Sequence, residues 1–200
     1  MKKKYEKQLD EQAAEYIDYA VEGASRMKKL ILDLLMYSKF SSNREEFTPT
    51  DMNHVVQGVC RHFSEEIKTA EAELTISALP VIQAKTSLMG QLFEQLISNA
   101  LKYRNGSKPV IEIGCSEKEE HFLFSIHDNG IGIDPKYSEK IFVLFQRLRS
   151  DHEAGEGTGV GLAISKKIIE LHKGAIWVKS EQGKGSTFYF TIPKDQKPEA

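Results

Sequence analysis

DNGIGID (Asp128–Asp134) and GEGTGVGLA (Gly155–Ala163) are the two stretches that decide how this chain folds around a ligand. A single carboxylate opens the first glycine-rich turn, and the second turn runs directly into an apolar helix. Glycine reaches backbone conformations that other residues resist, and it lets a ligand approach the main chain closely. A glycine-rich turn at the start of a helix points several N–H donors at one place, where the helix dipole favours an anion. A carboxylate acceptor combined with an anion cradle predicts a site for a purine triphosphate, ATP in particular.

The overall composition sets limits on the class of protein. The chain has 200 residues, a net charge of −2 and 40% hydrophobic residues, enough for one ordinary domain or for one domain with a small appendage. The near-neutral charge argues against general binding to nucleic acid, so any attraction to phosphate must be local. Cys60 and Cys115 form no close-spaced pair, which argues against a disulfide framework or a zinc site. Because no apolar run is long enough to span a membrane, we expect a soluble, cytoplasmic chain without a membrane segment.

Residues 5–40 are predicted to form one long helix. Apolar residues recur along it in alternating steps of four and three, at Ala13, Ile17, Ala20, Ala24, Met27, Ile31 and Leu34. This spacing is typical of a coiled-coil seam. Because a helix of this length extends well past a compact core, we expect the seam to pack against a partner helix. A helix folded onto its own domain is the alternative.

The rest of the chain mixes helices and strands without a steady βαβ alternation. Asp51 is predicted to cap a helix that presents Val55, Val56, Val59, Phe63 and Ile67 on one face. Further helices are predicted over residues 85–103 and 160–172, with a short one near 137–145. Strands are predicted over residues 73–78, 81–83, 110–116, 121–127, 175–180 and 186–192. This order predicts an α+β fold, a two-layer sandwich with helices on one face of a mixed sheet.

The helix over residues 85–103 carries polar side chains beside its apolar stripe. Asn99 lies at the edge of the stripe that Leu88 and Leu92 begin, with Gln95 and Lys102 next to it. A polar amide at a buried edge costs free energy unless it finds a partner. Mg2+ with bound phosphate would be one, because Mg2+ takes oxygen ligands, and Lys102 could neutralise the phosphate. An Asn99 that hydrogen-bonds a neighbouring loop explains the pattern equally well.

Both glycine-rich turns also have simpler explanations. Asp128 follows a predicted strand and could accept the exocyclic amine of adenine, but Asp-Asn-Gly is also a common turn sequence. The turn at residues 155–161 is not a Walker loop, since no GKS or GKT follows it. It also lacks the simple strand–turn–helix unit of a dinucleotide fingerprint. A phosphate-binding junction and a loop without function are therefore both open for that segment.

Residues 135–154, between the two turns, are predicted to form a lid. Its apolar anchor consists of Ile141, Phe142, Leu144, Phe145 and Leu148, and Lys136, Arg147 and Arg149 bring positive charge near the expected phosphates. Loops that close on ligands usually come from the less stable part of a fold, which fits the polar composition of residues 150–154.

Four segments in this order resemble the sequence boxes of sensor histidine kinases, most closely the phytochrome-like branch. They are QLFEQLISNALKYRN (Gln91–Asn105), DNGIGI (Asp128–Ile133), IFVLFQRL (Ile141–Leu148) and GTGVGLAI (Gly157–Ile164). The likeness covers about residues 50–193 and implies the α/β sandwich of the GHKL ATPase superfamily. The stretch RMKKLILDLLMYSK at residues 26–39 resembles the second helix of the dimerisation hairpin of these kinases.

The resemblance implies ATP and Mg2+ as ligands and gives individual residues roles. Asn99 matches the asparagine that holds Mg2+ against the phosphates, and Gln95 aligns with a second polar position of the same box. Lys102 and Arg104 are similar to phosphate-contacting residues, and Tyr103 to an aromatic residue of the adenine pocket. Asp128 matches the adenine-binding aspartate. The remaining implied contacts are Gly130, Gly132 and Ile133 in the first turn, Gly157, Thr158, Gly159, Val160, Gly161 and Leu162 in the phosphate loop, and Thr187 near the adenine.

One element of the family pattern is missing from the sequence. The phosphoacceptor histidine is usually followed at once by Glu or Asp and shortly afterwards by Pro, and none of the six histidines has this setting. We therefore expect residues 1–45 to be part of a dimerisation segment that lacks the acceptor, residues 46–193 to bind ATP, and residues 194–200 to be a tail.

The expected reaction passes the ATP γ-phosphoryl group to a histidine outside this chain, on a hairpin of the same or another chain. The phosphoryl group then moves to an aspartate of a response regulator, and the full-length protein is expected to be a homodimer, because an exposed apolar seam is an association site. A nucleotide-binding scaffold that acts through its N-terminal helix is the alternative function. The seam and the boxes argue against an ATP-hydrolysing relative.

Overall fold

The computed structural model describes residues 10–39, 45–146 and 158–195. Its helices are α2 (Glu11–Lys39), α3 (Met52–His62), α4 (Ser64–Thr69), α5 (Thr86–Lys102), η2 (Pro135–Tyr137), η3 (Lys140–Phe142) and α6 (Gly161–Leu171). Its strands are β1 (Thr48–Asp51), β2 (Glu73–Ile76), β3 (Val81–Ala84), β4 (Val110–Glu117), β5 (His121–Asp128), β6 (Ile176–Glu181) and β7 (Gly185–Pro193).

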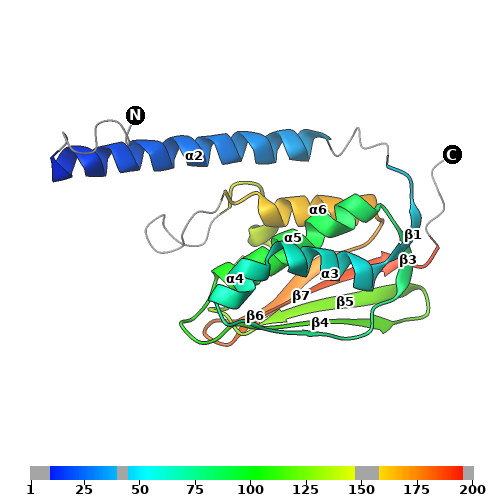
Figure 1. Ribbon diagram of the computed structural model, residues 1–200. Coiled ribbons are helices and arrows are strands. Elements are labelled where there is room, and N and C mark those ends of the chain that lie inside the picture. Colours follow the sequence, from blue (N-terminus) through cyan, green and yellow to red (C-terminus); the bar gives the residue numbers. More distant parts are fainter. Residues whose placement is uncertain (1–9, 40–44, 147–157, 196–200) are drawn as a thin grey trace.

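The strands form one mixed five-stranded sheet and one small pair. The order in the larger sheet is β2-β4-β5-β7-β6, with β2 parallel to β4 and every other neighbour antiparallel. Strands β1 and β3 form a separate antiparallel pair. Helices α3, α5 and α6 lie over one face of the larger sheet (Figure 1). The predicted α+β sandwich is therefore confirmed.

The hydrophobic core lies between the sheet and this helical layer. Phe124 of β5 and Phe190 of β7 stack with their ring centroids 4.8 Å apart, and Phe93 of α5 meets Phe190 edge-on. All three phenylalanine side chains are fully buried. Successive residues of a strand point to opposite faces of the sheet. Because Phe124 and Phe190 face the helices, every second residue of β5 and β7 counted from them also faces the helices.

Helix α2 runs alongside the sandwich rather than inside it (Figure 1). Asp10 caps its start by accepting a hydrogen bond from the Ala13 N–H at 2.7 Å. Leu30 and Tyr37 pack against the core of the sandwich, whereas Met27 and Ile31 of the predicted seam are 61% and 60% exposed. The helix thus contacts its own domain through one face and leaves the seam open, and the pairing of that seam with another helix stays a prediction.

Two predicted helices differ from the observed ones. Asp51 caps α3 as predicted, accepting from the Asn53 N–H at 2.9 Å, but the helix stops at His62, and the apolar face expected to continue to Ile67 is divided between α3 and α4. The helix predicted near residues 137–145 is replaced by the two short helices η2 and η3, because Val143 is extended and Phe145 has a φ of +62°.

Helix α5 begins at a junction built by a distant histidine. The backbone N–H of Lys85 donates to Nε2 of His172 at 3.1 Å, and His172 Nδ1 lies 2.7 Å from the Ile168 carbonyl oxygen. Since Nε2 accepts, Nδ1 is the nitrogen that donates, and the ring is the neutral tautomer. Burial lowers the pKa of His172, which is consistent with this state. The junction locks the start of α5 to the end of α6.

Within the described residues, no helix is both long enough and apolar enough to cross a lipid bilayer.

Candidate functional site

A cavity of about 500 Å³ opens between α5, the end of β5 and the loop that precedes α6. Many residues predicted to bind ATP line it: Gln95, Asn99, Lys102, Tyr103, Asp128, Gly132, Ile133, Thr158, Gly159, Gly161 and Leu162. They come from three segments that are far apart in the sequence. The structure therefore brings the three predicted chemical features together around one space.

Asp128 ends β5 and is only 8% exposed. Its Oδ1 accepts a hydrogen bond from the Gly130 N–H at 2.9 Å. Burial raises the pKa of this carboxyl, and the hydrogen bond from Gly130 offsets part of that rise. A buried carboxylate with a raised pKa is stabilised by a donor from a ligand, so the group is suited to receive an amine such as that of adenine.

The turn after Asp128 is held tightly against the end of α5. The Ile131 N–H donates to the Tyr103 carbonyl oxygen at 3.0 Å. A β-carbon on Gly130 would lie 2.3 Å from the same oxygen, so no larger residue fits there without a shift. Gly130 is buried beneath the cavity and shapes the turn rather than lining the space.

A second clamp fixes the far side of the same turn. Gly132 has a φ of +68°, and a β-carbon there would lie 2.1 Å from the Glu181 carbonyl oxygen. The Ile133 N–H donates to the Ser180 hydroxyl at 2.7 Å, and the Gly183 N–H donates to the Ile131 carbonyl at 2.7 Å. The turn is thus tied to the β6–β7 hairpin, which fixes the position of Asp128.

The polar side chains of α5 meet the start of α6 across the cavity. A β-carbon on Gly161 would lie 2.3 Å from Oε1 of Gln95, so the glycine makes room for this amide. Asn99 follows one turn later on the same helix and also faces the cavity. The N-cap of α6 is Val160, whose side chain makes no capping hydrogen bond, and the N-terminus of a helix generally favours an anion.

The two positively charged residues that follow Asn99, Lys102 and Arg104, differ in the cavities that they line. Lys102 lines the cavity, and its Nζ lies 5.1 Å from the ring centroid of Tyr103. Arg104 is exposed and lines a neighbouring cavity with Lys102, Phe63 and Glu66 instead. The predicted phosphate contact of Arg104 is therefore not placed in the same space as the other residues.

Two further predicted residues, Thr187 and Val160, do not line the cavity. Thr187 lies on the opposite face of the sheet, where its Oγ1 is 3.0 Å from Nδ1 of His127. Ser186 and Phe188, its neighbours on β7, line the cavity instead. Val160 is fully buried in the core, and Gly157 lies outside the described residues.

The predicted lid is described only in part. Its apolar anchor is confirmed for Ile141 and Phe142, which are buried, but was wrong for Phe145, which is 55% exposed. The Phe145 N–H, within the predicted lid, donates to the carbonyl oxygen of Gly159 in the loop before α6 at 2.9 Å. Lys136 lines the cavity and pairs with Asp134 at 2.6 Å. Residues 147–157, including Arg147 and Arg149, lie outside the described residues.

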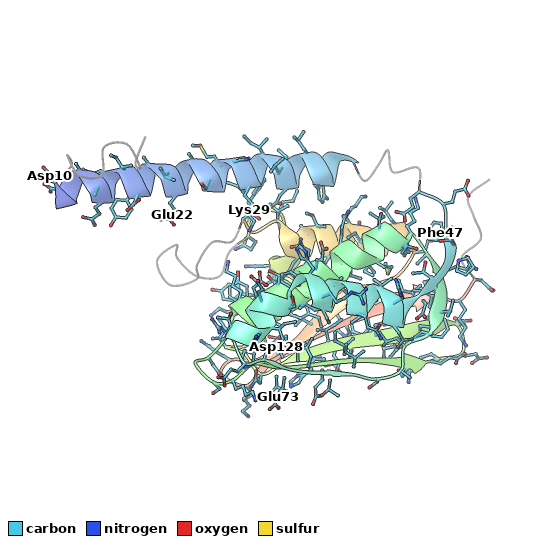
Figure 2. All side chains as sticks on the ribbon, in the orientation of Figure 1. Asp10, Glu22, Lys29, Phe47, Glu73 and Asp128 are labelled. Carbon is cyan, nitrogen blue, oxygen red and sulfur yellow. The ribbon has the colours of Figure 1, made fainter. Side chains whose placement is uncertain are left out.

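One wall of the cavity was not predicted from the sequence. Lys29 and Asp33 of α2 line it, and Asp33 Oδ2 accepts a hydrogen bond from the Thr158 hydroxyl at 2.6 Å. Figure 2 labels Lys29 on the part of α2 that passes above the start of α6. No local motif marks these two residues, because the contact joins positions 125 residues apart.

Comparisons with known proteins agree with this geometry. The profile of the histidine kinase-, DNA gyrase B- and HSP90-like ATPases matches residues 84–196. Cyanobacterial phytochrome A from Nostoc sp. is 47% identical over 95% of this chain, and the chain spans 25% of that protein. The nucleotide-free catalytic domain of histidine kinase ThkA is 29% identical with a TM-score of 0.64, over 74% of this chain and 96% of that one.

A further solved structure includes the region of α2. Histidine kinase ThkA in complex with the response regulator protein TrrA is 27% identical with a TM-score of 0.70, over 96% of this chain and 55% of that one. The resemblance to sensor histidine kinases of the phytochrome-like branch is thereby confirmed. The chain belongs to the histidine kinase-, DNA gyrase B- and HSP90-like ATPase family.

Proposed function

We propose that this chain is the ATP-binding catalytic part of a two-component sensor histidine kinase. The observation that carries the proposal is the convergence of Asn99, Asp128 and Thr158 on one cavity. A carboxylate at one end and an anion cradle at the other match the two ends of ATP. The confirmed family membership and the 47% identity to a phytochrome support the same conclusion.

In this proposal the adenine lies against Asp128. The buried carboxylate accepts the exocyclic amine, and Ile133 and Phe188 supply apolar surface to the ring. The triphosphate extends toward α6, where the backbone N–H groups of the first turn and the Lys102 ammonium meet its charge. The nucleotide thus spans the distance between the two glycine-rich segments.

The amide oxygens of α5 fit a Mg2+ ion. Within the described residues, no group of three or more His, Cys, Asp or Glu side chains could hold a metal. Mg2+ in nucleotide sites commonly relies on few protein oxygens, together with phosphates and water. Asn99 and Gln95 would hold the ion, which supplies charge neutralisation of the phosphates when bound. Gly161 supports this assignment, because it leaves space for the Gln95 amide.

The residues of this chain would position and neutralise the phosphates rather than react with them. Phosphoryl transfer depends mainly on alignment and charge stabilisation, for which Lys102 and the start of α6 are suited. The receiving histidine lies outside this chain, and an aspartate of a response regulator receives the group next. Residues 1–45 would then belong to the dimerisation segment and residues 46–193 to the ATP-binding part.

The exposed seam of α2 supports pairing with another helix. Met27, Ile31 and Leu34 are 61%, 60% and 47% exposed, and burying such a stripe against a second helix is favourable. We infer that this seam pairs within a homodimer of the full-length protein, through the helices of the histidine-bearing hairpin.

Radiolabelled ATP tests the proposal. The 200-residue chain, Mg2+ and [γ-32P]ATP are mixed with a separately produced hairpin of the full-length protein that carries its histidine. Label on the hairpin supports a kinase, and an Asp128→Asn chain should transfer less. Glu73→Gln, which alters an exposed ion pair with Lys108, serves as the control and should transfer normally. ATP binding without any transfer would favour the scaffold alternative instead.

A further inference from the structure

A hydrogen bond joins helix α2 to the wall of the cavity. The Asp33 carboxylate accepts from the Thr158 hydroxyl with Oδ2 2.6 Å from Oγ1, and both residues line the cavity. A hydroxyl that donates to a carboxylate at this distance forms a charge-assisted bond, about twice as strong as a neutral one. The bond therefore couples the position of α2 to the loop that begins α6.

The contact uses a face of α2 that is different from the seam. Leu30 and Tyr37 pack on the sandwich, and Asp33 lies between them at steps of three and four residues. Residues at this spacing share one side of a helix. Met27 and Ile31 lie on the exposed side. Helix α2 can therefore hold the cavity loop and pair with another helix at the same time.

Asp33 also competes with a bound triphosphate for the Thr158 hydroxyl. A hydroxyl has one proton to donate, so Thr158 cannot give it to a phosphate oxygen while Asp33 accepts it. The carboxylate in addition adds negative charge to the wall of an anion site, where like charges repel. Both effects of Asp33 disfavour the phosphates, whereas Lys29, one turn earlier on α2 and also lining the cavity, attracts them.

We propose that Asp33 is a positioning residue that sets the affinity for ATP, so that the Asp33–Thr158 hydrogen bond lowers this affinity and loss of that bond raises it. The inference rests on the proposed function, which places the phosphates at the Thr158 loop. Because linkage is reciprocal, bound ATP must weaken the Asp33–Thr158 hydrogen bond by the same factor. A movement of α2 that breaks this hydrogen bond would thereby change the affinity for the nucleotide.

Calorimetric titration of the 200-residue chain with Mg-ATP and with adenosine tests this inference. Asp33→Asn keeps the shape of the side chain but removes its charge, and it should raise the affinity for Mg-ATP about fivefold or more, the size of an ordinary coupling. Adenosine, which has no phosphates, should bind as before. Asp33→Glu restores the charge and should return the affinity toward that of the wild type. Asp18→Asn, on the same helix but away from the cavity, is the matched control.

A second background isolates the hydrogen bond. In a Thr158→Val chain, which has no hydroxyl to donate, Asp33→Asn should raise Mg-ATP affinity less than in the wild type. An equal effect in both backgrounds would overturn the hydrogen bond as the route. Unchanged Mg-ATP affinity in Asp33→Asn, or an equal gain for adenosine, would overturn the inference while the proposed function stands. A wild-type chain that binds no ATP would instead remove the proposed function, and the inference with it.

Discussion

The side-chain oxygen Oε1 of Gln95 lies very close to Gly161: a β-carbon added to this glycine would be 2.3 Å from it. This relationship joins the polar edge of α5 to the first turn of α6, the two elements expected to hold Mg2+ and the phosphates. The amide can occupy this place only because residue 161 has no side chain, so the pair can be tested by adding one methyl group.

Gly161→Ala should weaken Mg-ATP binding by about tenfold, because the displaced amide loses a contact worth about 1–3 kcal/mol. The fold should tolerate the change, since the end of a flexible side chain can move and alanine favours the helix. Calorimetry gives the affinity, and urea unfolding gives the stability. Gly90→Ala in α5, where a β-carbon meets nothing within 4 Å, is the control and should leave binding unchanged. Equal affinities in the two variants would contradict the assignment of Gln95.

Asp128→Asn should have opposite effects on binding and on stability. Burial raises the pKa of Asp128, so the folded state binds the proton more tightly than the unfolded state, and stability falls as pH rises from 3.8 through the folded pKa. At neutral pH the buried carboxylate is therefore a net cost that asparagine removes. ATP affinity should fall by roughly tenfold to a hundredfold, because a mispaired buried polar group costs about 1–3 kcal/mol.

Urea unfolding of the ligand-free chain at pH 7 and calorimetric titration with ATP measure the two effects of Asp128→Asn. An asparagine variant that binds ATP as tightly as the wild type would remove Asp128 from the adenine pocket. A large loss of stability would show that the carboxylate is mainly structural.

Gly132→Ala should destabilise the fold by about 3 kcal/mol or more, since it combines a left-handed φ with a backbone clash. The φ is +68°, and the added carbon would lie 2.1 Å from the Glu181 carbonyl oxygen. Gly106→Ala shares the positive φ, at +88°, but meets nothing within 4 Å, and should cost only about 1–2 kcal/mol. The difference between the two unfolding free energies measures the clash, and similar values would contradict the clamped turn.

His172 should make the protein less stable in mild acid. Its pKa is lowered from 6.5 by burial and by the nearby Lys85 charge, while hydrogen bonding to Ile168 and the Glu45 charge act in the opposite direction. The neutral ring stabilises the fold fully above about pH 6.5, and this contribution is lost as pH falls toward the folded pKa, because protonation of Nε2 removes the acceptor of the Lys85 N–H.

The slope of unfolding free energy between pH 6.5 and pH 5 checks the role of His172. His172→Gln should show a smaller slope than the wild type in this interval. His54→Gln, at an exposed position of α3, should keep the wild-type slope. A wild-type slope in the His172 variant would contradict the account of this junction.

Most of the sandwich could be predicted because its local signals agree with its tertiary contacts. Asp51 has the N-cap chemistry that the sequence indicates, and its hydrogen bond to Asn53 is present. Asn99 and Gln95 share the cavity edge of α5, as helical spacing predicts. The strand alternation also contained a signal for Ser186, since Phe188, Phe190 and Ile192 follow it at steps of two. Applying this alternation places Thr187 on the opposite face.

Other features depend on contacts that no local pattern encodes. No continuous helix forms over residues 137–145, because the chain turns at Phe145, where φ is +62°. This turn allows the Phe145 N–H to donate to the Gly159 carbonyl oxygen. Arg104 follows the end of α5, so its direction depends on how the chain leaves the helix and not on helical spacing. The docking of α2 through Asp33 requires the complete fold. Sequence periodicity identified the faces of α2 but not which of them meets the sandwich.

One nucleotide is expected to contact α5, the turn after Asp128 and the loop before α6 at once. Amide NMR spectra of the 15N-labelled chain, recorded with and without Mg-ATP, test it most directly. The signals of the Asn99 side chain, the Gly130 backbone and the Gly159 backbone should shift together along one saturation curve, while that of exposed Gly106 stays in place. Shifts confined to one of the three segments, or saturation at clearly different ATP concentrations, would contradict the account.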